Sequence, residues 1–210
     1  MAKTTEKNSV KQISDNVTES GQNSSEWIPG PRTSAKNVRD PRVRKTVNKL
    51  RAVYIELLGE MSPDRISVLK LTDRSHIDRK TFYLHYRNMD DMKNDVCDVK
   101  AADLIGRLTG EITQDIRIIY KYLDSLEPGV YSLLTSVQER DFRDRFLHQV
   151  FTSDAFSSYY QGDDADIVEG YLYSIFYIYE ENRISADPLE SSELADYAAR
   201  LVMNGIRGVK

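Results

Sequence analysis

The sequence predicts an all-α protein, and two features of its apolar pattern support this fold class. After residue 40, apolar residues recur at spacings of three and four, the period of one face of an α-helix. No segment shows the strict alternation of a half-buried strand, and no strand pattern alternates with helices. Proline and glycine interrupt the pattern where helices would end. We expect an N-terminal three-helix head followed by a larger helical domain.

The composition fits a folded protein in a reducing compartment. Hydrophobic residues make up 40% of the 210 residues and aromatic residues 10%, enough for a core. No run of 18 apolar residues occurs, and the first ten residues lack the apolar stretch of an export signal. The single cysteine, Cys97, excludes an intrachain disulfide. We expect a cytoplasmic protein that does not bind membranes.

Three segments follow from the composition and the apolar period. Residues 1–38 are rich in Ser, Thr, Asn, Gln and Lys and have almost no apolar period, so we expect a mobile tail. Residues 39–88 form the predicted head, and residues 89–210 form the helical body. Within the body, helical periods cover residues 89–108, 112–123, 130–137, 141–151, 163–181 and 191–206.

The first head helix begins at Asp40-Pro41, a helix cap followed by proline at the first helical position. It is amphipathic over about twenty residues. Its inward residues are Val43, Val47, Leu50, Tyr54, Leu57, Leu58 and Met61, and its opposite face carries Arg42, Lys45, Lys49 and Glu56. Ser62-Pro63-Asp64 ends it.

Two short helices joined by a tight turn follow. The first runs from Ser67 to Arg74, residues 75–77 form the turn, and Asp78 caps a second helix from Arg79 to Tyr86. If Phe82 and Tyr86 face inward, the remaining polar residues lie on or near the outer surface: Arg79, Lys80, Thr81, Tyr83 and His85. Such side chains can bind phosphate or base edges, as in a helix-turn-helix. A surface αα-hairpin with a solvated charged face fits this stretch equally well.

Charge is unevenly distributed along the chain. Residues 36–93 contain 14 Lys and Arg against 8 Asp and Glu, a net charge of +6, whereas residues 94–210 contain 11 against 21, a net charge of −10. A basic head on an acidic body suits a protein that binds DNA through its head alone.

The stretch from Arg42 to Val96 resembles the DNA-binding domain of the TetR family of bacterial transcriptional regulators. The resemblance is carried by the inward pattern of the first helix, Leu71-Thr72, Ile77-Asp78 and above all TFYLHY at residues 81–86. It implies DNA binding with Arg79, Lys80, Thr81 and Tyr83 in the groove and His85 on a phosphate.

The chain departs from the family pattern at three places. His76 stands where glycine is usual, Thr72 where alanine is usual, and Met89 where a phosphate-binding lysine is frequent. We expect Arg87 or Lys93 to supply the phosphate contact that Met89 cannot make.

The resemblance also implies the assembly and the regulation. It predicts a dimeric, ligand-responsive regulator, usually a repressor, that reads a palindromic double-stranded operator with helix 79–86. The homodimer would form through the helices near 163–181 and 191–206. An unidentified small-molecule effector would bind a cavity lined by Tyr120, Phe142, Phe146 and Tyr171. The alternative is a TetR-like interaction protein that binds another regulator rather than DNA.

The sequence does not favour an enzyme. It contains no Gly-rich phosphate loop, no nucleophile elbow, no zinc-protease motif and no Cys/His cluster. Cys97 with His85 or His148 is a formal nucleophile and base, but a lone cysteine in a linking helix is more simply core. Asp163, Asp164 and Asp166 are more simply partners of a helix dipole than metal ligands. We expect no cofactor and no metal.

Overall fold

The computed structural model describes residues 40–159 and 165–209, and all regular secondary structure in these two ranges is helical. The all-α prediction is therefore confirmed. The predicted tail, residues 1–38, lies outside the described residues. None of the helices in the described ranges has both the length and the apolar character that crossing a bilayer requires.

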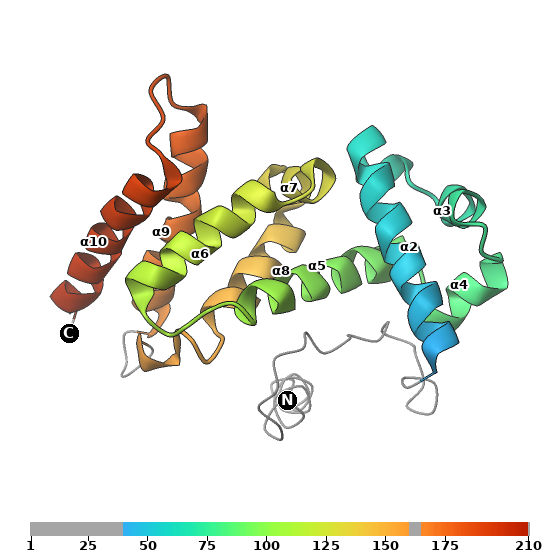
Figure 1. The fold of residues 1–210 in the computed structure, drawn as a ribbon, viewed down its shortest axis with the longest axis horizontal. Coiled ribbons are helices and arrows are strands. Elements are labelled where there is room, and N and C mark those ends of the chain that lie inside the picture. The colour runs from blue at the N-terminus through green and yellow to red at the C-terminus, as the bar shows by residue number, and fades with distance from the viewer. Residues whose placement is uncertain (1–39, 160–164, 210) are drawn as a thin grey trace, which may run out of the picture.

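The head consists of α2 (Pro41–Glu60), the short 3-10 helix η1 (Pro63–Arg65), α3 (Val68–Ser75) and α4 (Arg79–His85), at one end of the molecule (Figure 1). Each predicted cap forms. The side chain of Asp40 accepts from the backbone N–H of Arg42 at 2.8 Å. Ser67 accepts from Lys70 N–H at 3.2 Å, and Asp78 accepts from Lys80 N–H at 2.7 Å. These caps satisfy backbone donors that lack partners within the first helical turn.

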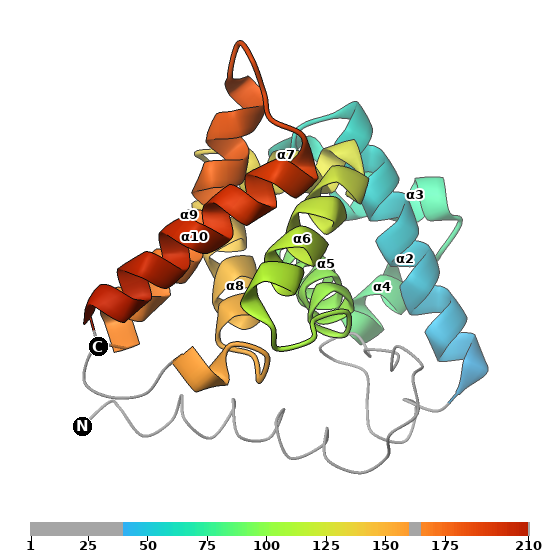
Figure 2. The same cartoon turned by 60° about the vertical axis from the view of Figure 1, so that its left-hand side comes forward.

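The body begins with α5 (Met89–Ile105), which runs from the head into the body and packs along α8 (Arg140–Phe151). The other body elements are α6 (Ile112–Ser125), α7 (Pro128–Thr135), η2 (Ser157–Tyr159), α9 (Ala165–Ile184) and α10 (Ser191–Val209). Helix α10 packs on α6 and α9. In both views α9 and α10 lie at the end opposite the head (Figures 1 and 2).

One apolar core continues from the head into the body. It includes Leu50 of α2, Phe82 of α4, Val96 of α5 and the inner faces of the body helices. A second contact between head and body lies where α2 packs on α7. Gly129 makes this contact possible, because a Cβ there would lie 2.5 Å from Leu58 Cβ and 2.6 Å from the backbone carbonyl carbon of Leu58.

Helices α9 and α10 are packed equally closely. A Cβ at Gly205 of α10 would lie 2.2 Å from the ring of Tyr171 in α9, so the ring lies directly against the glycine backbone. The core of this helix pair includes Leu172, Ile175, Ala198 and Val202, which are all buried. The two helices therefore form a compact layer that covers one end of the body.

Candidate nucleic-acid interface

Helix α4 is short and is fixed to the head by its aromatic residues. Phe82 and the C-cap residue Tyr86 are both fully buried, and their ring centroids lie 5.4 Å apart. With this side facing inward, the helical period places Lys80, Tyr83 and Leu84 away from the core, whereas Arg79 lies three positions before Phe82 and is the first residue of the helix. Arg79 and Lys80 are exposed, Tyr83 is 40% exposed and Leu84 is 67% exposed. Thr81 lies at the border and is half-buried.

The amino end of α4 carries two exposed cations, Arg79 and Lys80. Among the residues that the structure describes, neither Arg79 nor Lys80 forms an ion pair. Their positive charges lie at the amino end of the helix, where the free N–H groups also favour an anion. This face is therefore suited to a polyanion.

The turn before α4 has the backbone conformation expected from its position. His76 adopts φ 50° and ψ 44°, the left-handed region, and its backbone N–H donates to the carbonyls of Asp73 and Thr72. Ile77 N–H donates to Thr72 C=O at 3.0 Å. This is the usual ending of a helix at a residue with positive φ, where glycine is preferred. The glycine-to-histidine departure thus changes the side chain and leaves the turn intact.

A buried polar network connects α4 to α2 and α5. The guanidinium of Arg51 donates to both oxygens of Asp95, from Nε at 2.8 Å and from Nη2 at 2.7 Å. The hydroxyl of Tyr86 donates to Asp95 Oδ2 at 2.7 Å. All three residues are buried. Burial and the neighbouring carboxylate raise the pKa of Tyr86, so its hydroxyl stays protonated and can donate. The end of α4 is thereby tied to two other helices.

The structure contradicts the expected exposure of His85. Its side chain is buried, with 6% of the residue exposed, and burial lowers its pKa below the ordinary value of histidine. A buried, neutral imidazole is a poor partner for a phosphate on the surface. The reason for the error is geometric, because His85 follows Phe82 by three positions and lies on the same inward side.

Of the two basic residues expected to replace the missing lysine at Met89, one is already engaged. Lys93 Nζ donates to Glu139 at 2.7 Å and lies 3.8 Å from Asp90, with 20% of its side chain exposed. It joins α5 to the start of α8 and is not available to a phosphate without breaking that pair. Arg87 has 78% of its side chain exposed and lies at a loose 3.9 Å from Asp91. Of the two, Arg87 is therefore the more accessible candidate for the expected phosphate contact.

Helix α2 adds basic residues to the head: Arg42, Lys45 and Lys49, which were expected on its outer face, and Arg44, which had no predicted place. Arg42, Arg44, Lys45 and Lys49 are all exposed. Figures 1 and 2 show the amino-terminal part of α2 beside α4. The first turns of α2 therefore extend the positive surface of α4. In the sequence, the feature that indicates these basic residues of α2 is the charged face opposite its apolar stripe.

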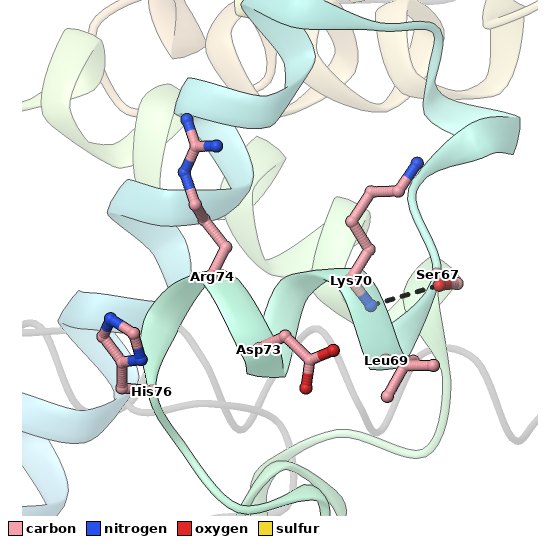
Figure 3. A pocket seen from close by; sticks show the side chains of 6 residues that line it. All are labelled: Ser67, Leu69, Lys70, Asp73, Arg74 and His76. Atoms are coloured by element: carbon pink, nitrogen blue, oxygen red, sulfur yellow. Dashed lines mark hydrogen bonds between the residues drawn. The ribbon is translucent and has the colours of Figure 1, made fainter.

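A shallow hollow of about 530 Å³ lies along α3. Figure 3 shows its lining residues, which are Ser67, Leu69, Lys70, Asp73, Arg74 and His76. Its cations serve the head itself: Arg74 pairs with Glu56 at 2.7 Å and with Glu60, both on α2, and Lys70 Nζ donates to Arg65 C=O at 3.1 Å. The Arg74 pairs hold α3 against α2, and the Lys70 bond holds α3 against η1. We assign no ligand to this hollow.

The four residues expected to line an effector cavity are core residues or nearly so. Tyr120, Phe142 and Phe146 are buried, and Tyr171 is half-buried against Gly205. The hydroxyl of Tyr120 donates to Ile175 C=O at 2.9 Å. None of the four lines the α3 hollow or the other described cavity, a cleft of about 670 Å³ between the end of α2 and α7. The effector cavity stays a prediction.

The environment of Cys97 disfavours nucleophilic chemistry. Burial raises the pKa of its thiol to about 12, and Sγ lies 3.5 Å from the carbonyl oxygen of Phe142, to which it donates. A thiol needs a lowered pKa to react as a thiolate. In the described ranges no three His, Cys, Asp or Glu side chains are grouped as metal ligands. Asp163 and Asp164 lie outside the described residues.

Comparison with known proteins supports a regulator fold. No family model matches the chain. An uncharacterised HTH-type transcriptional regulator of Bacillus subtilis, YxbF, is 31% identical over 83 residues, which are 39% of this chain and 22% of that protein. The chain thus spans less than a quarter of the length of this curated relative.

Two crystal structures have the same fold. A TetR transcriptional regulator from Streptococcus agalactiae aligns with a TM-score of 0.63 and 21% identity, over 80% of this chain and 98% of that one. A TetR-family transcriptional regulator from Streptomyces coelicolor aligns with a TM-score of 0.52 and 14% identity, over 78% and 83% of the two chains. The resemblance expected from the sequence is confirmed in the fold.

Proposed function

We propose that this chain, which has the fold of TetR transcriptional regulators, is a homodimeric DNA-binding regulator that reads an operator with α4. The observation that carries the proposal is the two-sided structure of α4, with Phe82 and Tyr86 buried and Arg79 and Lys80 exposed and unpaired with carboxylates of the described chain. Arginine and lysine donate to O6 and N7 of guanine, the commonest specific contact in the major groove. Tyr83, beside them, can donate to a base or a phosphate.

Phosphate contacts on both sides of α4 would set its position in the groove. Exposed Arg42, Arg44 and Lys45 lie at the start of α2, and exposed Arg87 follows the end of α4. Each phosphate that such a cation neutralises releases a counterion, which makes affinity fall as salt rises. The net charge of −10 on residues 94–210 keeps the rest of the protein away from the DNA backbone.

The proposed dimer interface is the outer side of α9 and α10. Large apolar residues are exposed along both helices: Ile167 at 51%, Tyr177 at 47%, Tyr197 at 46% and Leu201 at 46%. Tyr197 and Leu201 are four positions apart and therefore form one stripe on α10. A twofold dimer would cover this stripe and would present two heads to half-sites roughly 34–36 Å apart. Repression and response to an effector stay predictions from the resemblance.

Selection of bound duplexes from a random library by the full chain, followed by fluorescence anisotropy at two salt concentrations, tests DNA reading. We expect Arg79→Ala, Lys80→Ala and Tyr83→Ala each to lose about 1–3 kcal/mol of operator affinity. Lys121→Ala changes a similarly exposed cation in the body and should bind normally. Unchanged affinity in all three α4 variants would contradict the assignment of the reading helix.

Phosphate contacts have a different signature from base contacts. We expect Arg44→Ala to weaken specific and non-specific binding alike and to reduce the slope of log affinity against log salt by about 1. An Arg44→Ala protein with the wild-type slope would remove α2 from the interface. A dimer without salt-sensitive affinity for any duplex would instead favour the protein-binding alternative.

The dimer is tested by sedimentation. Leu201→Glu places a charge in the middle of the proposed interface and should shift the protein to monomer, with loss of operator affinity. Val137→Glu is the matched control, because Val137 is 82% exposed and belongs to neither α9 nor α10. If Leu201→Glu sediments as wild type does, the interface lies elsewhere.

A further inference from the structure

The outward side of α4 contains one side chain that neither charge nor hydrogen bonding explains. Arg79, Lys80 and Tyr83 all carry donors, whereas Leu84 carries none. Leu84 is also the most exposed large apolar residue of residues 40–88, at 67%, compared with 52% for Leu69 and 40% for Tyr83. Neither the helical period nor the family resemblance gave Leu84 a role in the interface.

The position of Leu84 relative to Lys80 determines what it faces. The two residues are four positions apart, so their side chains are neighbours on the helix surface, roughly 5–6 Å apart at Cβ. Arg79 and Tyr83 form the parallel pair beside them. The outward side of α4 therefore carries two cations in its first turn, Arg79 and Lys80, and two largely apolar side chains in its second turn, Tyr83 and Leu84. A base edge contacted by Lys80 would therefore lie near Leu84 in the same groove.

Base edges offer a single apolar group in the major groove, the C5-methyl group of thymine. The cations beside Leu84 select a polyanion over an apolar protein surface, which would have to desolvate them. We propose that Leu84 reads a thymine methyl group, so that each half-site of the operator carries a thymine at the position facing it. This inference rests on the proposed function, since it names a base that α4 would read.

The size of the expected effect follows from the area involved. Burying one methyl group against an aliphatic side chain changes affinity by about fourfold. Leu84→Ala should leave folding intact, because the side chain is largely exposed and alanine favours a helix. A loss of affinity in this variant is then a property of the contact and not of the fold.

The experiment replaces each thymine of the selected operator by deoxyuridine, which removes only the C5-methyl group. Affinities of the full-length wild type, Leu84→Ala and Leu69→Ala are compared on each duplex. We expect one thymine per half-site where the replacement weakens wild-type binding by about three- to fivefold. Leu84→Ala should bind the thymine and deoxyuridine duplexes equally. Leu69→Ala, the matched exposed leucine on α3, should retain the full deoxyuridine penalty.

Two results would overturn the inference alone. One is an operator on which no deoxyuridine replacement matters, and the other is a penalty that Leu84→Ala retains in full. Failure of the wild type to select any sequence would overturn the proposed function and this inference with it. Because the first two results require a selected operator, the two kinds of failure are distinguishable.

Discussion

The hydroxyl of Tyr86 lies 2.7 Å from Asp95 Oδ2 and donates to it in the interior of the protein. Tyr86 caps the carboxyl end of α4, and Asp95 lies on α5, so this bond fixes the end of the proposed reading helix against the helix that enters the body. A hydrogen bond to a charged acceptor contributes about 1.5–3 kcal/mol to stability. We expect Tyr86→Phe to lose about that much by urea unfolding while keeping the buried ring.

The same variant should lose specificity in DNA binding. If the bond positions α4, Tyr86→Phe lowers the ratio of operator affinity to random-duplex affinity, whereas random-duplex binding, which depends on phosphates, stays unchanged. Tyr122→Phe is the control, because Tyr122 is also a buried tyrosine and its hydroxyl donates to Lys100 C=O at 2.8 Å in the body. The comparison is made at a temperature where both proteins are folded. If the ratio of operator affinity to random-duplex affinity is the same in wild type and Tyr86→Phe, the hydrogen bond contributes to stability alone and not to DNA specificity.

Gly129 should be intolerant of a side chain. In Gly129→Ala the new Cβ meets the backbone of α2 at Leu58, which cannot move without shifting the head. Overpacking of this kind costs about 1–3 kcal/mol, and thermal or urea unfolding measures it. Gly59→Ala is the matched control, because Gly59 follows Leu58 in α2 and has open space around an added Cβ. This variant should gain about 0.5–1 kcal/mol in stability, since alanine favours a helix over glycine. A stable Gly129→Ala protein would contradict the close α2–α7 packing.

His76 should be replaceable with a gain in stability. Its φ of 50° lies in the left-handed region, which is unfavourable for side chains other than glycine and, to a lesser degree, asparagine and aspartate. His76→Gly should stabilise the protein by about 1 kcal/mol, after allowance for the greater freedom of glycine in the unfolded chain. Urea unfolding of both proteins at pH 7.5 provides the measurement. A loss of stability would mean that the imidazole makes a compensating contact.

His85 should make stability depend on pH. Burial lowers its pKa in the folded protein, so the unfolded chain binds the proton more tightly. The stabilisation from keeping His85 neutral is complete above the unfolded pKa of about 6.5 and is lost as the pH falls below it. Wild type should therefore lose more stability than His85→Gln between pH 7.5 and pH 5.5. Equal losses by urea unfolding would show that His85 does not change its protonation on folding.

The local signals in the sequence predicted the head helices to within a residue or two. The pair expected at 67–74 and 79–86 is observed at Val68–Ser75 and Arg79–His85. This accuracy has a simple cause, because Ser67 and Asp78 cap the helices through their own side chains and need no distant partner. The exposure of Lys80 and Tyr83 followed from the period of the helix once Phe82 was placed inside, whereas Arg79, three positions before Phe82, is exposed as the first residue of the helix.

Other parts of the site depend on residues far apart in the sequence. Lys93 was a candidate phosphate ligand until the structure placed Glu139 of α8 beside it. Asp95 is an ordinary carboxylate within an acidic stretch of sequence, and only the folded head brings Arg51 and Tyr86 to it. His85 was placed wrongly because a seven-residue helix with two aromatic anchors does not define how wide its inward side is. Such contacts are tertiary, and no local pattern encodes them.

The shared use of α5 limits how this protein can be divided into interchangeable parts. Its second turn supplies Asp95 to the head, and the same helix holds Asp98, which binds Arg145 of α8 at 2.7 Å. A chimaeric regulator joined at residue 88 would bury Arg51 without its carboxylate, an arrangement that costs about 3–5 kcal/mol. A head moved to another helical body would therefore have to bring α5 with it, together with the α8 surface that α5 packs against.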